Sequence, residues 1–334
     1  KATLAVRTGI ETDTQHGAVV PPIYLSSNYT FADFGEPRQY DYARSGNPTR
    51  TNLADALAAL EGGAGAVVTG TGMGAVHLVT TALLKAGDLL IAPHDCYGGT
   101  WRLFEYLAAK GHYRVQFVDQ GDESALAEAL AQQPALVWVE TPSNPLLRVV
   151  DVAAIAAASH EVGAKVVVDN TFLSPLLQQP LSLGADVVVH STTKYINGHS
   201  DVVGGVAIAK EAELADSLVW WANCLGLTSG AFDSYLTLRG LRTLAPRLRA
   251  HQENTDRILA FLQQQPLVKK IYHPSLPSHP GHEIARRQQS GFGAMLSFEL
   301  DCNETGLRAF LAALRLFSVA ESLGGVESLV AHPA

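Results

Sequence analysis

Short apolar runs alternate with helical patterns along most of the chain. Seven runs of three or four residues are rich in valine, leucine and isoleucine, as buried strands are. They lie at 66–68, 89–91, 115–118, 136–139, 166–168, 187–189 and 206–208. Between several of them apolar residues recur at helical spacing, as at 124–132 and 152–161. This alternation predicts an α/β protein with a mostly parallel sheet covered by helices on both faces.

The two ends of the chain follow other patterns. Residues 1–50 are rich in glycine and proline, so we expect an extended arm with little core of its own. From 214 to 265 the pattern is helical, and a strand at 294–300 and a helix at 304–314 follow it. The chain therefore divides into an arm at 1–50, a larger domain at 51–243 and a smaller α+β domain at 244–334.

The composition indicates a globular protein and argues against a nucleic-acid-binding or membrane-spanning one. Hydrophobic residues make up 47% of the 334 residues and charged residues 17%, which predicts a large buried core. The net charge of −8 comes without a long run of like charges, and no apolar stretch reaches the length of a membrane span. The three cysteines are far apart and form no CxxC pair. We therefore expect a cytoplasmic protein that binds neither nucleic acid nor membrane.

Two charged residues after neighbouring apolar runs are the main candidates for chemistry. Asp169 ends the run at 166–168, and Lys194 lies 25 residues later, after the run at 187–189. A lysine can bond to the aldehyde of pyridoxal 5'-phosphate (PLP), and a buried carboxylate can keep its ring nitrogen protonated. Taken alone, Lys194 would be interpreted as a solvated surface lysine, and Asp169 as a carboxylate that caps the turn after its own strand. Together, at the ends of parallel strands, they predict a PLP site.

A glycine-rich turn and two hydroxyls suit the phosphate of this cofactor. The segment 70–74, Gly-Thr-Gly-Met-Gly, opens a helix whose first N–H groups can bind an anion. Ser191 and Thr193 alternate just before Lys194, so in an extended chain their hydroxyls would share one side.

Tyr97 is followed by Gly98 and Gly99, which leaves room for its ring to lie flat over the cofactor. Its alternative interpretation is a half-buried packing residue. Cys96 reads as a small apolar residue, and the 12 histidines include no HExxH pair, so we assign no metal.

Longer motifs cover essentially the whole chain. They are DYARSGNPTR (41–50), GTGMGAVH (70–77), APHDCYGGTWRLF (92–104), VETPSNP (139–145), VVVDNTFLSP (166–175), HSTTKYINGHSDVVGG (190–205) and AESLGGVESLVAHP (320–333). Through them the chain resembles the Cys/Met metabolism family of PLP-dependent enzymes, and most of all its cystathionine-forming members. The resemblance implies an aspartate-aminotransferase-like fold (fold type I) with a seven-stranded sheet.

The resemblance also implies roles for individual residues. Lys194 would bind PLP covalently and move protons, Asp169 would face the ring nitrogen and Tyr97 would stack on the ring. The implied phosphate ligands are Gly72, Met73, Ser191 and Thr193, with Tyr42 and Arg44 reaching the phosphate of a neighbouring subunit. The arm would thus help to form a homotetramer built from dimers with shared active sites. The implied substrate residues are Asn144, Arg102, Glu321 and Ser322.

The activity implied is γ-replacement: L-cysteine replaces the acyl group of O-succinyl-L-homoserine, or of another O-acylhomoserine, to give L-cystathionine. This is a step of methionine biosynthesis by transsulfuration. Cystathionine γ-lyase and O-acylhomoserine sulfhydrylase stay open as alternatives, whereas a methionine γ-lyase would carry cysteine at the position of Gly99. A catalytically silent binding protein on the same fold is a rival of another class, against which stands the complete set of Lys194, Asp169 and Tyr97.

Two departures from the family pattern bear on the substrate. Members that use succinyl esters often have two arginines where this chain has Arg44 and Ser45, which leaves the acyl group open. Members also continue for about 50 residues beyond the position of Ala334 and carry there an arginine for the substrate carboxylate. We therefore expect a further segment, with that arginine, to be missing from this sequence.

Overall fold

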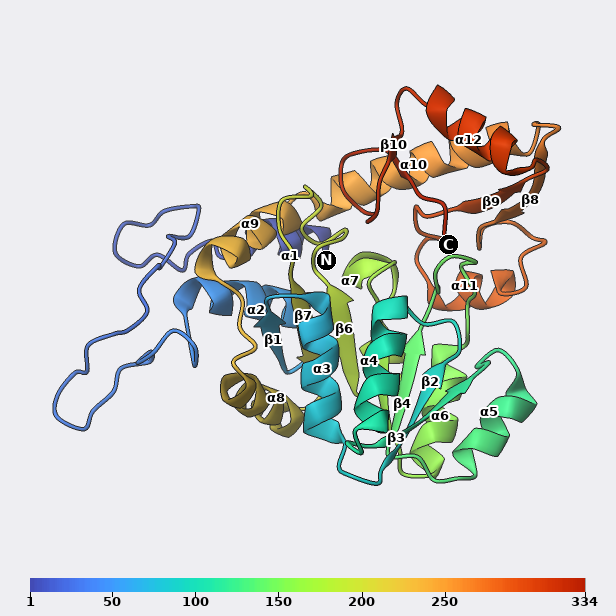
Figure 1. The fold of residues 1–334 in the computed structure, drawn as a ribbon. Coiled ribbons are helices and arrows are strands. Elements are labelled where there is room, and N and C mark those ends of the chain that lie inside the picture. The colour runs from blue at the N-terminus through green and yellow to red at the C-terminus, as the bar shows by residue number, and fades with distance from the viewer. Residues whose placement is uncertain (334) are drawn as a thin grey trace.

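A seven-stranded sheet forms the centre of the molecule in the computed structural model, which describes residues 1–333 (Figure 1). The strand order is β1-β7-β6-β5-β4-β2-β3. The strands are β1 (Gly65–Thr69), β2 (Leu89–Pro93), β3 (Arg114–Val118), β4 (Leu136–Glu140), β5 (Lys165–Asp169), β6 (Val187–Ser191) and β7 (Gly205–Ala209). Strand β7 is antiparallel to both of its neighbours, β1 and β6, and the other neighbouring strands of the sheet are parallel to one another. The prediction of a mostly parallel seven-stranded α/β sheet is confirmed.

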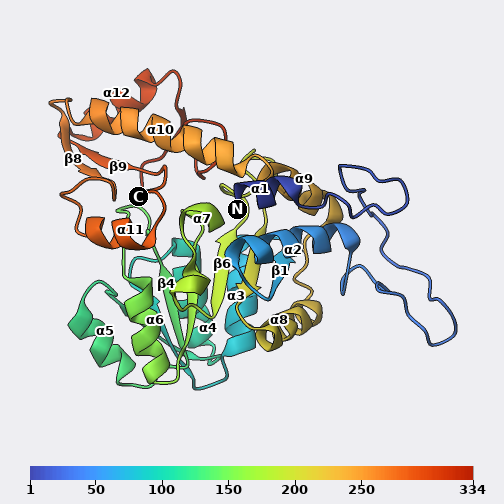
Figure 2. The same cartoon turned by 180° about the vertical axis from the view of Figure 1, so that it is seen from behind.

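Helices cover both faces of this sheet (Figures 1 and 2). One face packs against α3 (Gly72–Leu83), α4 (Gly98–Ala109) and α8 (Ala212–Leu225). The other packs against α2 (Pro48–Glu61), α5 (Glu123–Leu130), α6 (Val152–Glu161), α7 (Ser174–Leu177) and α9 (Ala231–Leu241). Alternate residues of one strand, such as Trp138 and Val139, enter different cores. Burial on both faces explains why the strands read as continuous apolar runs.

Helix α2 begins at Pro48, at the end of the segment 1–50 that is rich in glycine and proline. Asn47 caps it by accepting hydrogen bonds from the N–H groups of Thr49 and Arg50, and Pro48 occupies its first turn. Proline there loses no hydrogen bond and its φ suits the helix. The helix ends at Gly62, which has a left-handed φ of 80°.

The remaining elements belong to the two ends of the chain. The C-terminal part consists of α10 (Leu244–Leu262), β8 (Val268–Tyr272), α11 (His282–Gln288), β9 (Ser297–Leu300), α12 (Glu304–Ala313), β10 (Ser318–Val319) and β11 (Leu329–Val330). At the other end a short helix, α1 (Ala2–Arg7), buries Ala5, which the expectation of an extended arm missed. A long loop between α1 and α2 projects from the body (Figure 1).

Candidate active site

The two main candidates lie at the same edge of the sheet. Asp169 is the last residue of β5, in register with Glu140 of β4 and Val189 of β6. Lys194 follows the end of β6 at Ser191. Since β5 and β6 are parallel neighbours, their carboxyl ends meet, and a ligand there can contact both residues.

The start of α3 lies directly against Ser191. A Cβ atom at Gly72 would stand 2.9 Å from the Cβ and 3.1 Å from the Oγ of Ser191, so only glycine allows this approach. Thr71 caps the helix through a 2.8 Å hydrogen bond from the Gly74 N–H to its Oγ1. The first N–H groups of a helix lack intrahelical partners and lie at its positive end. Together with the Ser191 hydroxyl they form a cradle of the right chemistry for a phosphate.

The chain turns after Ser191 and does not stay extended. The Lys194 N–H donates to the Ser191 carbonyl at 3.3 Å, and the Thr193 Oγ1 accepts from the Gly204 N–H at 3.0 Å. The expectation that the hydroxyls of Ser191 and Thr193 share one side of an extended strand is therefore wrong. The strand ladder with β7 stops at Ser191, and turn hydrogen bonds replace it.

Asp169 shares its surroundings with a second buried carboxyl group. Its Oδ1 accepts from the Thr171 N–H at 3.0 Å, and burial raises its pKa against the opposing effects of Thr171 and His190. Beside it, Glu140 is 8% exposed and its Oε2 accepts from the Tyr97 N–H at 2.8 Å. Burial and the neighbouring Asp169 raise the pKa of Glu140 well above its usual range.

Two adjacent buried carboxyl groups favour a cation at this place. No lysine, arginine or histidine within residues 1–333 forms a salt bridge with Asp169, and a protonated pyridine nitrogen would supply the positive charge. The residues present therefore fit PLP. Glu140 was missed in the sequence, although it ends an apolar run in the same way as Asp169.

Tyr97 precedes α4 and lies close to the phosphate cradle. A Cβ atom at Gly99 would stand 2.5 Å from the Tyr97 Cε1 and 3.1 Å from the Met73 Sδ, so the starts of α3 and α4 meet here. Tyr97 is 53% exposed, which leaves part of its ring open to a flat ligand.

Residues near the end of the chain lie beside the Lys194 side chain. Its Nζ donates to the Ser322 Oγ at 2.8 Å, and burial lowers its pKa, against the opposing charge of Glu321. Arg247 supports the same loop from α10, because its Nη1 donates to the Tyr195 carbonyl at 2.8 Å. Two of the four expected substrate residues, Glu321 and Ser322, thus lie at the lysine.

Other expected site residues lie apart from this group. Arg44 donates to the Asn223 carbonyl at 3.2 Å and lies over the Tyr42 ring, in the projecting loop of Figure 1. Asn144 is exposed in the loop after β4, and Arg102 is exposed on α4 near Gly98. No hydrogen bond of the described residues joins any of these four side chains to Lys194.

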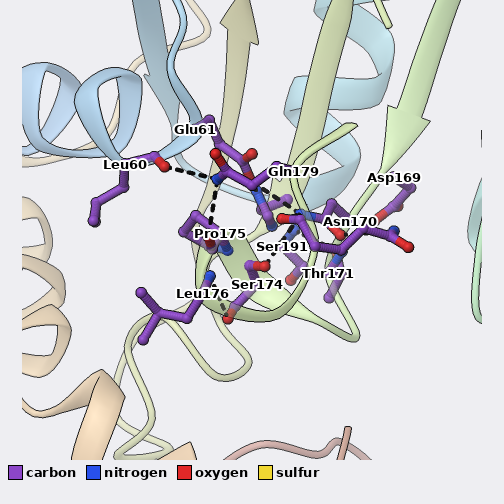
Figure 3. A network of polar contacts seen from close by, with 12 residues as sticks. Leu60, Glu61, Asp169, Asn170, Thr171, Ser174, Pro175, Leu176, Gln179 and Ser191 are labelled. Carbon is purple, nitrogen blue, oxygen red and sulfur yellow. Dashed lines mark hydrogen bonds and ion pairs between the residues drawn. The ribbon is translucent and has the colours of Figure 1, made fainter. Parts of the chain in front are cut away.

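A buried polar network at the end of α2 was also not predicted from the sequence (Figure 3). Glu61, at the end of α2, binds Asn170 and His190, which adjoin Asp169 and Ser191 in the sequence. Its members come from three distant segments, and the only sequence signal is polar residues within apolar surroundings.

The described part of the chain, residues 1–333, holds no group of three or more His, Cys, Asp or Glu placed to hold a metal ion. It also contains no helix that is both long and apolar enough to cross a membrane.

Comparisons with known proteins identify relatives that match almost the whole chain. Cystathionine gamma-synthase of Escherichia coli (strain K12) is 66% identical over 334 residues, which are 100% of this chain and 86% of that protein. A crystal structure of cystathionine gamma synthase from Xanthomonas oryzae pv. oryzae in complex with cystathionine has 62% identity and a TM-score of 0.99, covering 99% of this chain and 86% of that one. A cystathionine beta-lyase of Lactococcus lactis subsp. cremoris (strain MG1363) is 45% identical, over 99% of this chain and 87% of that protein.

The similarity to cystathionine-forming enzymes expected from the motifs is thereby confirmed, and the L. lactis β-lyase is less similar to this chain than the E. coli synthase is. The sequence profile of the Cys/Met metabolism PLP-dependent enzymes matches residues 2–334. This chain belongs to the Cys/Met metabolism family of PLP-dependent enzymes.

Proposed function

We propose that this chain is a PLP-dependent transferase with cystathionine γ-synthase activity. It replaces the acyl group of O-succinyl-L-homoserine, or of another O-acylhomoserine, with L-cysteine and releases L-cystathionine and the free acid, in methionine biosynthesis. The observation that carries the proposal is the 66% identity to the E. coli synthase, against 45% to the β-lyase. Amino acids are accordingly its substrates.

PLP, when bound, supplies an electron sink for negative charge at the substrate carbons. In our proposal Asp169 holds the proton on its ring nitrogen, because a buried carboxylate favours a cation opposite it. Tyr97 lies on the ring, and the cradle of Gly72, Met73 and Ser191 binds the phosphate. Thr193 belongs to the same set, with its hydroxyl bonded to the Gly204 backbone.

Lys194 has two tasks in this proposal. It bonds PLP covalently between turnovers, and as a free amine it takes a proton from one substrate carbon and returns it at another. Its lowered pKa favours the neutral amine, which is the form that accepts a proton. Ser322, 2.8 Å from Nζ, holds the amine in place, and Glu321 beside it borders the substrate.

Substrate binding involves two more residues in this proposal. Asn144 lies near the cofactor ring or the substrate carboxylate, and Arg102 meets the acyl end. The acyl group stays open between succinyl and another acid, as the sequence left it.

The projecting arm supports self-association. Its side chains Leu25, Phe31 and Phe34 are 75%, 51% and 101% exposed, and such apolar exposure favours a partner surface. We propose that the arm contacts a neighbouring subunit, where Tyr42 and Arg44 reach the phosphate, within a homotetramer built from dimers. The division at 1–50, 51–243 and 244–334 and a cytoplasmic location are further parts of the proposal.

The test of the proposed reaction offers O-succinyl-L-homoserine to the enzyme with and without L-cysteine. We expect cystathionine to exceed 2-oxobutyrate when cysteine is present. Mainly 2-oxobutyrate would identify a lyase instead, and neither product together with no visible cofactor absorbance would identify a silent relative.

Replacing Lys194 tests the residue that carries the chemistry. We expect Lys194→Ala to abolish turnover and the covalent adduct that borohydride traps in the wild type. The matched control is Lys165→Ala, at the opposite end of β5, where Nζ pairs with Asp186 at 2.8 Å. A Lys194→Ala variant with wild-type turnover would overturn the assignment.

A further inference from the structure

Glu61 contacts the ends of both strands that carry the site, β5 and β6, from the sheet face that packs against α2. Its Oε1 accepts from the Asn170 Nδ2 at 3.0 Å and lies 2.6 Å from the His190 Nε2. Asn170 follows Asp169, and His190 precedes Ser191. Figure 3 shows Glu61 reaching from its helix toward Asn170 at the ends of these strands.

The network lies on the sheet face opposite to the cofactor site. Val189 and Val167 belong to the core under α3 and α4, whereas Val188 and Val168 belong to the core under α2. Because side chains alternate along a strand, His190 shares the α2 face and Ser191 the α3 face. Glu61 therefore acts on the site only through the strand ends.

The contacts of Glu61 join β5 and β6 just beyond the point where their backbone pairing ends. The register of β5 with β6 ends at Asp169 and Val189. One residue further, the Glu61 carboxylate bridges Asn170 to His190. On the site face, the Ser191 N–H donates to the Thr171 Oγ1 at 2.9 Å, so the same two ends are joined on both faces.

Burial of these groups needs a reason. The side chains of His190 and Glu61 are 1% and 0% exposed, and the Glu61 Oε2 and His190 Nδ1 have no hydrogen-bond partner among the described residues. A buried ionisable pair commonly adds less stability than apolar side chains of the same size. The arrangement thus favours a specific geometry over greater stability.

We propose that Glu61 is a positioning residue that sets the separation of Asp169 and Ser191. These are the proposed contacts of the ring nitrogen and the phosphate, so this separation decides how well PLP spans the site. The inference rests on the proposed cofactor roles of Asp169 and Ser191, and it adds Glu61 and His190 to the residues that maintain them.

The experiment titrates full-length variants, stripped of cofactor, with pyridoxal 5'-phosphate and follows visible absorbance and circular dichroism. Glu61→Leu removes the acceptor oxygen, and we expect the Kd for PLP to rise about 10- to 100-fold, the usual effect of losing hydrogen bonds to a charged group. The dichroism of the bound cofactor should change as well. Glu61→Gln keeps an acceptor oxygen and should bind at least about tenfold more tightly than Glu61→Leu.

Gln179→Leu is the matched control. The Gln179 Nε2 donates to the carbonyls of Leu60 and Pro175 at 2.8 and 2.9 Å, beside Glu61, but it does not bond the ends of β5 or β6. We expect this variant to lose stability toward urea without a change in PLP affinity. If Glu61→Leu likewise lost only stability and kept its PLP affinity and dichroism, the inference would be refuted.

A second pair of variants covers a Glu61→Leu protein that fails to fold. His190→Gln places an amide N–H near the position of Nε2, whereas the shorter His190→Asn withdraws it from Glu61. Weaker PLP binding by His190→Asn than by His190→Gln supports the inference, and equal binding refutes it. A wild-type protein that binds no PLP would instead refute the proposed function itself.

Discussion

Replacing Gly72 by alanine should separate α3 from Ser191. The added Cβ would lie 2.9, 3.1 and 3.1 Å from the Cβ, Cα and Oγ atoms of Ser191. Two of these are atoms of the strand end rather than of a flexible side-chain tip, so they cannot rotate away. Either the helix start or the end of β6 has to move.

The size of the effect follows from this overlap. Inserting one extra methyl group into a well-packed place typically costs about 1–3 kcal/mol. If the whole penalty falls on the cofactor-bound form, the Kd for PLP rises about 5- to 150-fold. If it falls on the fold as well, the stability of the cofactor-free protein drops with it.

Two measurements separate these outcomes. PLP titration of the cofactor-free protein gives the Kd, and urea denaturation of the same protein gives the free energy of unfolding. The matched control is Gly70→Ala in the same turn, where the nearest atom to an added Cβ is the Thr228 carbonyl oxygen at an ordinary 3.5 Å. We expect the control to behave like the wild type.

Wild-type PLP affinity in Gly72→Ala would refute the reasoning. It would mean that the cofactor phosphate does not depend on the approach of α3 to Ser191. Equal losses in Gly72→Ala and Gly70→Ala would show that the turn, and not the approach to Ser191, is sensitive.

Three further changes test other parts of the site. Burial raises the pKa of Glu140 above its value in the unfolded chain, so its contribution to stability is full below about pH 4.3 and is lost as the pH rises through the raised pKa. Glu140→Gln should therefore flatten the decline of urea stability with rising pH in the cofactor-free protein, and an equally steep decline in the variant would contradict this. Gly99→Cys places a Cβ atom 2.5 Å from the Tyr97 Cε1, so the ring must shift and the Kd for PLP should rise about tenfold. In the control Gly98→Ala the atom nearest to the added Cβ is the Arg102 Nη1 at 3.5 Å, and equal PLP affinities of the two variants would contradict the prediction. Arg247→Met removes the hydrogen bonds that the guanidinium donates to the carbonyls of Tyr195 and Gly240. It should lower the free energy of unfolding, measured by urea titration, by about 3 kcal/mol, and an unchanged free energy of unfolding would contradict this.

Asp169 and Lys194 could be predicted because Asp169 ends, and Lys194 follows, a strand that is buried on both faces. Continuous apolar runs mark such strands, and in a parallel sheet their carboxyl ends gather at one edge. The pairing of Asp169 with Val189 places both residues at that edge. Their roles toward PLP stay predictions until the variants are measured.

The turn after Ser191 and the place of Glu140 were harder to predict. An alternation of two hydroxyls is typical of a strand, but the ladder with β7 ends at Ser191 and Gly205, and the chain then turns. Glu140 is set apart only by its neighbours Asp169 and Tyr97, which lie 29 residues after it and 43 residues before it. Both depend on contacts that a local pattern does not contain.

By itself the sequence determined the strands, most of the helices, the family and the pair of Asp169 and Lys194, because hydrophobic periodicity and motifs are properties of neighbouring residues. Only the tertiary structure decided that Glu61 lies between Asn170 and His190, 109 and 129 residues away. Strand order in the sheet differs from order in the chain, so side chains that meet at its edge come from segments whose sequences carry no sign of one another.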